Sequence, residues 1–512
     1  MKHKVFQKLQ QVFLSSGSMT GELSKTKSNM ATFYEEARKL IALAIPLITI
    51  ELGSTAPVAL TASYVGRKLG PVYLSAFTLS TLTLNLLTLS VMFGLFSATD
   101  TLSPQAFGAG NYKEVGFIAM RSYILSMWII IPANTILFFV MEDLLIFCGQ
   151  ERESSRLAQQ WYRVYMTALP FNALYIVTWK FLSVQEVMMP LIITMVVATG
   201  VVLPLCLEWL IPTLGFLGSS TALLIHQVAE VIILLSYLAI FRPHQKETWP
   251  GVKAWRQSMD VEPLLLYIRL GMGGILASGE WIWWELISLI IGSLGAISLD
   301  AHMIPTQLIT IAYMIPLGAG TALSIRLGST LPKDVNRAQN LALWSTVFMI
   351  VLFAFLSIGI FFARKAICAL FTTDPDVIHF VEGIWWKVVL FYFTLSIFAV
   401  FTQIAISLGM QWMLGFATII ILWFIGLPAF YIYTIRYDGG LNAAWSWISP
   451  PYIAMNFIFA YRFLSANWNS ISLAIREREG ISDKFQGSRD EVFVVQESCD
   501  MIVVNEKTSL LR

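Results

Sequence analysis

Two carboxylates and three tryptophans fall within six consecutive positions, 280–285, where the sequence reads Glu-Trp-Ile-Trp-Trp-Glu. A carboxylic acid held out of water favours its neutral form, so it can bind and release a proton near neutral pH. The face of an indole ring attracts organic cations. Glu280 beside Trp283 and Trp284 therefore predicts a site at which an organic cation and a proton compete.

The helical spacing of these residues separates the two acids. Glu280 and Trp284 are four positions apart, so a helix places them on one face. Glu285 is rotated from Glu280 by about 140°, and both acids can reach one cavity only if the helix bends at Gly279 or within 271–274. The alternative is that the tryptophans form an interfacial belt and the acids hold neighbouring helices together.

Two further residues are candidates for the same cavity. Glu51 lies twelve positions beyond Lys39, about 18 Å along a helix, which places it near the middle of a membrane. The neighbouring stretch 53–57 contains Gly, Ser, Thr and Pro and predicts a break in the helix. A structural lock between helices is an equally good interpretation of Glu51. Gln307 could line the cavity or hydrogen-bond to a neighbouring helix.

The remaining polar residues near the expected spans have more ordinary interpretations. We expect Asp100 to cap a helix or organise a loop, and Lys180 to reach the interface or pair with Glu186. His302 is expected where water reaches it, and His226 is the only histidine clearly inside a span.

The composition of the whole chain explains why these few groups stand out. Of 512 residues, 56% are hydrophobic and 13% are charged, against about a quarter charged in a soluble domain. This excludes a soluble enzyme, a disordered chain and a nucleic-acid binder, and the net charge of +2 offers no surface for a polyanion. The four cysteines have no disulfide or metal-ligand spacing, so we expect no metal and no bound cofactor.

A membrane-spanning helix needs about 20 mostly apolar residues. Twelve stretches meet this requirement, which predicts an all-α integral membrane protein: 38–65, 71–99, 115–140, 157–184, 190–210, 217–241, 263–293, 300–325, 338–363, 377–408, 412–434 and 440–464. Lys and Arg between the spans number 21 on the side of the two termini and 7 on the other side. The positive-inside rule then predicts that both termini are cytosolic.

The chain also repeats itself. Residues 65–70 resemble 291–295, and Trp161, Leu203-Pro204 and Gly215 recur 224 positions later as Trp385, Leu427-Pro428 and Gly439. Six spans per half give a parallel repeat about an axis along the membrane normal, with two six-helix lobes and a substrate between them. The predicted organisation is a cytosolic arm (1–36), an N-lobe (37–241), a cytosolic linker (242–262), a C-lobe (263–465) and a cytosolic, disordered tail (466–512).

Four stretches resemble the multidrug and toxic compound extrusion (MATE) family, most closely its animal type. They are 65–70, 97–108 (Ser-Ala-Thr-Asp-Thr-Leu-Ser-Pro-Gln-Ala-Phe-Gly), 279–285 and 315–328, within a similar region of about 35–465. The resemblance implies two six-helix lobes in a V, alternating access, and proton- or sodium-driven antiport of organic cations. It assigns cation and proton handling to Glu280 and Glu285.

This chain also departs from the animal-type pattern. Those relatives carry further acids in their eighth and tenth helices, where this sequence has Thr306, Gln307, Thr394, Ser396 and Gln403. Glu51 has no matched position in the family's acidic site. Substrate range and proton stoichiometry are therefore open.

The expected function is export of organic cations or xenobiotics in exchange for protons. One alternative is a sodium-coupled exporter. A second is a lipid-linked flippase of the same superfamily, which needs a strongly cationic cavity. A third is an integral-membrane acyltransferase, which needs a deep histidine with an Asp or Asn partner. We expect a monomer in the plasma membrane or an endolysosomal or vacuolar membrane. The ending Glu506 to Leu510-Leu511 matches the acidic dileucine pattern that endocytic adaptors bind.

Overall fold

The protein is all-helical over the residues described by the computed structural model, 19–371 and 375–480, and these residues contain no strand. Ten helical stretches in this part are long and apolar enough to cross a membrane. The other two expected spans are also helical. One is divided into α7 (Arg152–Tyr165), η2 (Met166–Ala168) and the short α8 (Leu169–Val184), and in the other, α21 (Gly440–Ser465), polar and proline residues lower the hydropathy. The all-α membrane fold is confirmed.

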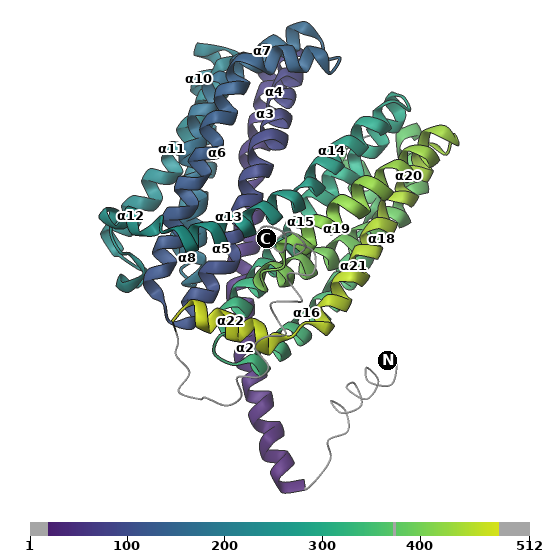
Figure 1. The fold of residues 1–512 in the computed structure, drawn as a ribbon. Helices are drawn as coiled ribbons and strands as arrows, with labels where there is room; N and C mark the ends of the chain where they lie inside the picture. Colours follow the sequence, from purple (N-terminus) through teal and green to yellow (C-terminus); the bar gives the residue numbers. More distant parts are fainter. Residues whose placement is uncertain (1–18, 372–374, 481–512) are drawn as a thin grey trace, which may run out of the picture.

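The helices form two arms that meet at one end and diverge at the other (Figure 1). The first arm, residues 34–241, contains α7, η2, α8 and most of α2 (Met19–Ser54), with α3 (Ala56–Leu69), α4 (Pro71–Leu84), η1 (Asn85–Leu89), α5 (Ser90–Ala109), α6 (Tyr112–Phe147), α9 (Met189–Val197), η3 (Ala198–Val202), α10 (Leu203–Leu214) and α11 (Phe216–Phe241). We call the end that carries α22 (Trp468–Arg478) the closed end and the other the open end.

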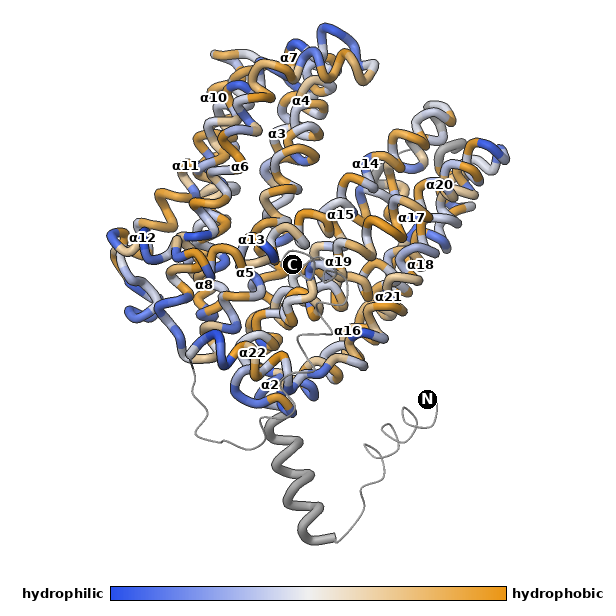
Figure 2. Tube along the Cα trace, in the orientation of Figure 1, coloured by the Kyte–Doolittle hydropathy of each residue, from blue (hydrophilic) through white to orange (hydrophobic). Residues whose placement is uncertain are grey.

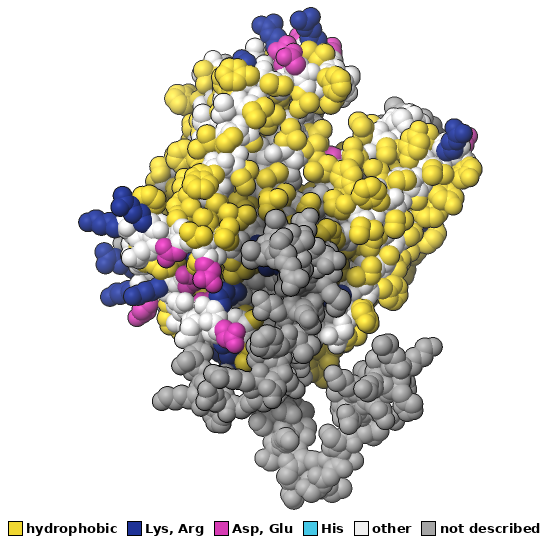
Figure 3. All heavy atoms as spheres, in the orientation of Figure 1, with side chains coloured by type: hydrophobic (Ala, Val, Ile, Leu, Met, Phe, Trp, Pro, Cys, Tyr) yellow, Lys and Arg dark blue, Asp and Glu magenta, His cyan; other side chains and the backbone are white. Residues whose placement is uncertain are grey.

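The second arm, residues 261–465, contains α21 together with α13 (Val261–Ala277), α14 (Gly279–Gly292), α15 (Ala296–Thr330), α16 (Val335–Phe362), α17 (Arg364–Phe371), α18 (Pro375–Ser407), α19 (Gln411–Ala417), η6 (Thr418–Gly426), α20 (Leu427–Tyr431) and η7 (Ile432–Arg436). Figure 3 shows a deep notch between the arms at the open end. The two-lobed V shape expected from the sequence is therefore present.

The internal repeat reappears in the backbone. Gly70 and Gly295 join the first two spans of each half, and both have positive φ values, 97° and 107°, which favour glycine. Leu203 and Leu427 each begin an α-helix immediately after a π-helical segment, η3 in the first arm and η6 in the second. The two sequence halves thus fold with the same irregularities at matching positions.

The arms meet through close backbone contact at the closed end. A Cβ atom added to Gly274 of α13 would lie 2.1 Å from the carbonyl oxygen of Gly94 of α5, so neither position has room for a side chain. Thr101 donates a hydrogen bond to the carbonyl of Ile406, and Gln105 donates one of 2.7 Å to the carbonyl of Ser407. The stretch 97–108 is therefore one part of the first arm that holds the second, and α2 is another, because Glu36 pairs with Arg326 of α15 at 2.7 Å.

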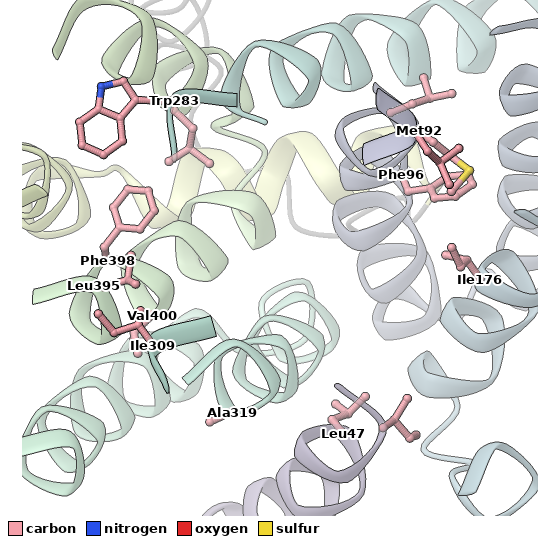
Figure 4. Packing of buried hydrophobic residues seen from close by; sticks show 14 of the residues in the cluster. Leu47, Met92, Phe96, Ile176, Trp283, Ile309, Ala319, Leu395, Phe398 and Val400 are labelled. Carbon is pink, nitrogen blue, oxygen red and sulfur yellow. The ribbon is translucent and has the colours of Figure 1, made fainter. Parts of the chain in front are cut away.

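The outside of both arms suits lipid. Large apolar side chains are more than half exposed on the helices, including Trp128, Phe139, Phe355 and Phe424. Apolar stretches cover the middle of both arms, and charged side chains gather toward their ends (Figures 2 and 3). Each arm also has a core of its own: Met92, Phe96 and Ile176 lie on one side of Figure 4, and Trp283 and Phe398 lie on the other.

Two segments outside the spans are more ordered than the sequence suggests. The linker after α11 contains η4 (Lys246–Thr248), η5 (Val252–Ala254) and α12 (Trp255–Ser258), and buried Arg121 of α6 anchors it through a 2.7 Å hydrogen bond to the carbonyl of Ser258. The first part of the expected disordered tail forms α22 instead. Arg478 of α22 donates a hydrogen bond to the side chain of Gln105 in the first arm. Ser472 of α22 donates one to the carbonyl of Leu331 in the second arm.

Candidate functional site

The first helix of the second arm is broken beside the acid–tryptophan cluster. α13 ends at Ala277 and α14 begins at Gly279, with Ser278 between them. The Ser278 hydroxyl donates a 2.8 Å hydrogen bond to the carbonyl of Ile275, and Trp423 donates its indole N–H to the carbonyl of Gly279 at 3.2 Å. The Ser278 hydroxyl thus supplies a partner to a carbonyl in the last turn of α13, and Trp423 ties the start of α14 to η6. The helix is thus interrupted next to Gly279, where the sequence allows a bend, and Glu280 lies in the first turn of α14.

Glu280 is buried inside the second arm and held by a tyrosine from the last span. Only 8% of the residue is exposed. The phenol of Tyr452 donates a 2.8 Å hydrogen bond to the Glu280 carboxylate, and the indole N–H of Trp284 donates to the same phenol oxygen at 2.9 Å. Since the Trp284 donor occupies one lone pair of the phenol, the Tyr452 proton is directed at the acid. Glu280, Tyr452 and Trp284 form one directed chain, which we call the acid chain.

Aromatic rings surround the acid chain. The ring of Tyr452 meets those of Trp283, Phe391 and Phe398 at centroid distances of 5.8, 5.4 and 5.1 Å, all with steep interplanar angles. Trp284 packs on Phe391 at 5.0 Å. Trp283 is fully buried, and its indole N–H donates 2.9 Å to the carbonyl of Leu422. Trp283 is therefore a wall of the site, whereas half-buried Trp284 is the ring that remains partly accessible.

Glu285 points away from the acid chain. Its side chain is exposed, and no described residue forms a hydrogen bond or ion pair with it. Trp281 is one turn earlier on the same face of α14, and its ring lies 5.9 Å from that of Phe93 in the first arm. Glu285 therefore faces the side of α14 that is turned toward the first arm. The two acids are separated as the helical spacing predicts.

Glu51 occupies the corresponding break in the first arm. α2 ends at Ser54 and α3 begins at Ala56, so the break predicted from the sequence is present. The hydroxyl of Ser54 donates 2.7 Å to the carbonyl of Glu51. The carboxyl group of Glu51 is half-buried and interacts electrostatically with Lys180 and Asp100.

Tyr313 of α15 is a half-buried tyrosine near both Glu280 of its own arm and Glu51 of the first arm. Gln307, on the same helix, is exposed, and no hydrogen bond links it to Glu280. The structure therefore brings together Glu280, Trp283 and Trp284, and leaves Gln307, Glu285 and Glu51 outside the acid chain.

Three of the ordinary interpretations were wrong. Asp100 is no helix cap, because α5 continues to Ala109, and it forms a bidentate ion pair of 2.6 and 2.7 Å with Lys180. Lys180 does not pair with Glu186, since Glu186 binds Arg326 at 2.8 Å.

His302 is not in water either. It is fully buried, and its Nε2 lies 3.2 Å from the hydroxyl of Ser288 on the neighbouring helix α14. The packing of α14 against α15 excludes water from the imidazole. This burial cannot be predicted from the sequence of either helix alone.

Sequence reasoning also missed two parts of the site region. Tyr452 carries no local signal, because its partner Glu280 is 172 positions away and only the packing of the second arm joins them. Glu230 is different. It is the only acid within 217–241, so the rule that marks Glu51 as a deep acid applies to it equally. Glu230 is 6% exposed and lies 3.7 Å from His226.

The sequence profile of the MatE family matches residues 46–207 and 278–432, which is more than half of the chain and includes parts of both arms. The chain belongs to the MatE family. Multidrug and toxin extrusion protein 1 of Homo sapiens is 31% identical over 363 residues, or 69% of this chain and 62% of the relative. The match thus spans less than two thirds of that relative's length.

Other MatE relatives match over a larger share of their length. An uncharacterized transporter of Schizosaccharomyces pombe is 26% identical over 88% of this chain and 83% of its own. The crystal structure of the eukaryotic MATE transporter AtDTX14 superposes with a TM-score of 0.79 at 20% identity, covering 88% of this chain and all of that one. A multidrug resistance MATE transporter in an outward-facing conformation gives a TM-score of 0.74 at 16% identity, over 86% and 97% of the two chains. The animal-type resemblance and the two-lobe fold are confirmed.

Proposed function

We propose that this MatE-family chain is a secondary active antiporter that exports organic cations or xenobiotics in exchange for protons. The observation that carries the proposal is the acid chain: one buried carboxylate with a directed hydrogen bond, enclosed by the rings of Trp283, Trp284, Phe391 and Phe398. Aromatic faces stabilise an organic cation, and the carboxylate supplies the opposite charge.

Competition at Glu280 is the proposed coupling step. A cation favours the ionised carboxylate, and a proton removes the charge that attracts the cation. Each ligand therefore weakens the other by the same factor. A proton arriving from the open end displaces the cation there, and the protonated protein closes the notch and exposes the site at the other end.

The 21 to 7 distribution of basic residues favours a cytosolic closed end, so both termini are placed in the cytosol.

The alternatives make different demands on the same region. A lipid-linked flippase needs unpaired deep cations for a pyrophosphate group, but Lys180 is neutralised by Asp100. Buried Lys387 has no acidic partner among the described residues, and its ammonium group donates hydrogen bonds to Asn442 and Ser446 instead. An acyltransferase needs access to its histidine, and His226 is fully buried. A sodium-coupled exporter would use the same carboxylates, and it remains the main competitor of the proton-coupled mechanism.

We propose that the protein acts as a monomer in the plasma membrane or an endolysosomal or vacuolar membrane, with protons, or alternatively sodium, as the coupling ion and no bound cofactor. The acidic dileucine pattern ending at Leu511 lies outside the described residues. Adaptor binding to it stays a prediction.

Uptake of a fluorescent organic cation into proteoliposomes tests the proposal. The same vesicles receive a pH gradient, a sodium gradient at equal pH, or no gradient. Uptake driven by the pH gradient alone supports proton coupling, whereas uptake driven only by sodium supports the competitor. Absence of uptake under both gradients, for cations of several classes, contradicts the proposal.

A further inference from the structure

A second pair of titratable side chains is buried in the first arm, away from the acid chain. His226 and Glu230 are one turn apart on α11, and 0% and 6% of the two residues are exposed. The Nε2 atom of His226 lies 3.7 Å from Oε1 of Glu230. An ionisable pair inside a membrane helix is costly unless it has a use or complete hydrogen bonding.

The hydrogen bonding of this pair is incomplete. Nε2 of His226 lies 3.0 Å from the hydroxyl of Thr199 on η3, while Nδ1 of the same ring is buried without a partner. Among the described residues, His226 is the only ion partner of Glu230, and none donates a hydrogen bond to its carboxyl group. A neutral imidazole beside a bare carboxylate leaves a buried charge with no stabilising group, which is strongly unfavourable.

The groups around the pair provide no permanent positive charge. Tyr165 of α7 and Tyr175 of α8 are the titratable side chains near Glu230, and both are uncharged near neutral pH. Gln227, the neighbour of His226, is occupied by a 3.2 Å hydrogen bond from Asn172. Lys68, at the end of α3, is paired with Glu208 of α10 at 2.7 Å. Because no Lys or Arg among the described residues pairs with Glu230, a proton or another small cation must supply the missing charge.

We infer that His226 and Glu230 form a proton-binding site in the first arm, separate from Glu280 in the second. The distance and the unpaired Nδ1 favour a proton, because a proton on either residue makes the pair neutral overall without further ligands. Tyr175 of α8 lies between the pair and the break at Glu51, so the two acids of the first arm are separated by an uncharged ring.

The role of this site in transport rests on the proposed antiport. If the protein exchanges protons for cations, protonation of the His226–Glu230 pair changes the charge of the first arm during the cycle. Two separate proton sites, one in each arm, then allow proton uptake at more than one point of the cycle.

Infrared difference spectroscopy of the purified protein in lipid nanodiscs tests the binding site without any transport assay. Spectra recorded between about pH 5 and pH 9 report protonated carboxyl groups. We expect a titrating carboxyl band that Glu230→Gln removes and Glu280→Gln leaves in place. His226→Asn should shift the midpoint of that band, since it removes the partner of the acid. Glu208→Gln is the matched control, because it removes an exposed acid from the same arm.

Three results overturn the inference. The first is the absence of any band assigned to Glu230 over this pH range. The second is a Glu230 band that His226→Asn leaves unmoved, which would show that the two groups do not share a proton. The third is a loss of the protonated-carboxyl band when sodium, but not choline, is added at constant pH. That result would show that the site binds a metal cation instead of a proton. If Glu230→Gln fails to fold, the titrating carboxyl band that persists in both Glu280→Gln and Glu208→Gln is followed in His226→Asn, and an unmoved midpoint of that band overturns the inference.

Transport measurements distinguish this inference from the proposed function. In proteoliposomes, Glu230→Gln should move the pH midpoint of cation uptake by about one unit, which is a tenfold change in proton concentration. If the Glu230 band titrates but a pH gradient drives no cation uptake, the proposed antiport is contradicted and the inference of a proton-binding site stands. If a pH gradient drives uptake and Glu230→Gln leaves the pH midpoint of uptake unchanged, the antiport stands and the role of the His226–Glu230 pair in transport is contradicted.

Discussion

The phenol of Tyr452, on the last span, donates a 2.8 Å hydrogen bond to the Glu280 carboxylate on the seventh. The bond stabilises the ionised form of the acid, and the Trp284 indole fixes its direction. The buried carboxylate can therefore attract a cation, but among the described residues a single hydroxyl donates to it, so it can also be protonated.

Replacing Tyr452 by Phe should change the pH dependence of transport without abolishing it. The substitution keeps the aromatic ring and removes the donor, so Glu280 loses a bond that favours its charged form, worth about 1 to 3 kcal/mol. Cation binding should therefore begin to weaken at a higher pH than in the wild type. Fluorescent cation binding across a pH series measures this. An unchanged midpoint would show that the hydrogen bond has no role in coupling.

The two acids of α14 should differ in importance. Glu280→Gln should lower pH-driven cation uptake by tenfold or more, at least about 1.4 kcal/mol, because it removes the only buried charge of the acid chain. Glu285→Gln should have a smaller effect, mainly on substrate affinity, since Glu285 is exposed and unpaired among the described residues. Uptake by both variants in the same vesicles decides the order. A more damaging Glu285→Gln contradicts it.

Contact between the arms at the closed end should be essential for alternating access. Gly274→Leu places a side chain where the Gly94 carbonyl lies, 2.1 Å from the added Cβ, so the arms must separate at this end. We expect loss of uptake and faster thiol labelling of a cysteine introduced near Gln105. Gly359→Leu is the matched control, because its Cβ would meet nothing within 4 Å. Unchanged uptake and labelling in Gly274→Leu would contradict this role.

The Asp100–Lys180 pair should stabilise the first arm rather than bind substrate. Lys180→Met leaves the half-buried Asp100 carboxylate without its cation, a loss that costs about 3 to 5 kcal/mol for a fully buried pair and less here. Thermal unfolding in detergent should therefore occur at a lower temperature. The double variant Asp100→Asn/Lys180→Met should recover part of the loss. A single variant as stable as the wild type would show that the pair carries little energy.

Local patterns predicted much of this molecule. Hydropathy identified the spans, and the glycine and serine residues around Ser54 and Ser278 indicated the breaks that position Glu51 and Glu280. The predictions that were wrong concern residues whose partners come from other helices. Lys180 has Glu186 six positions away in sequence, yet the fold brings Asp100 to it from another helix. Tyr452 could not be predicted, because its distance from Glu280 is set by the packing of two spans. Glu230 could have been found by the same rule as Glu51.

Cation affinity of the purified protein across a pH series tests the central claim most directly. Competition at Glu280 predicts that affinity weakens as the pH falls, because protonation removes the negative charge that holds the cation, and that Glu280→Gln flattens this dependence. Glu208→Gln, which removes an exposed acid, should behave like the wild type. A wild-type affinity that is independent of pH throughout the range in which transport occurs would contradict the account.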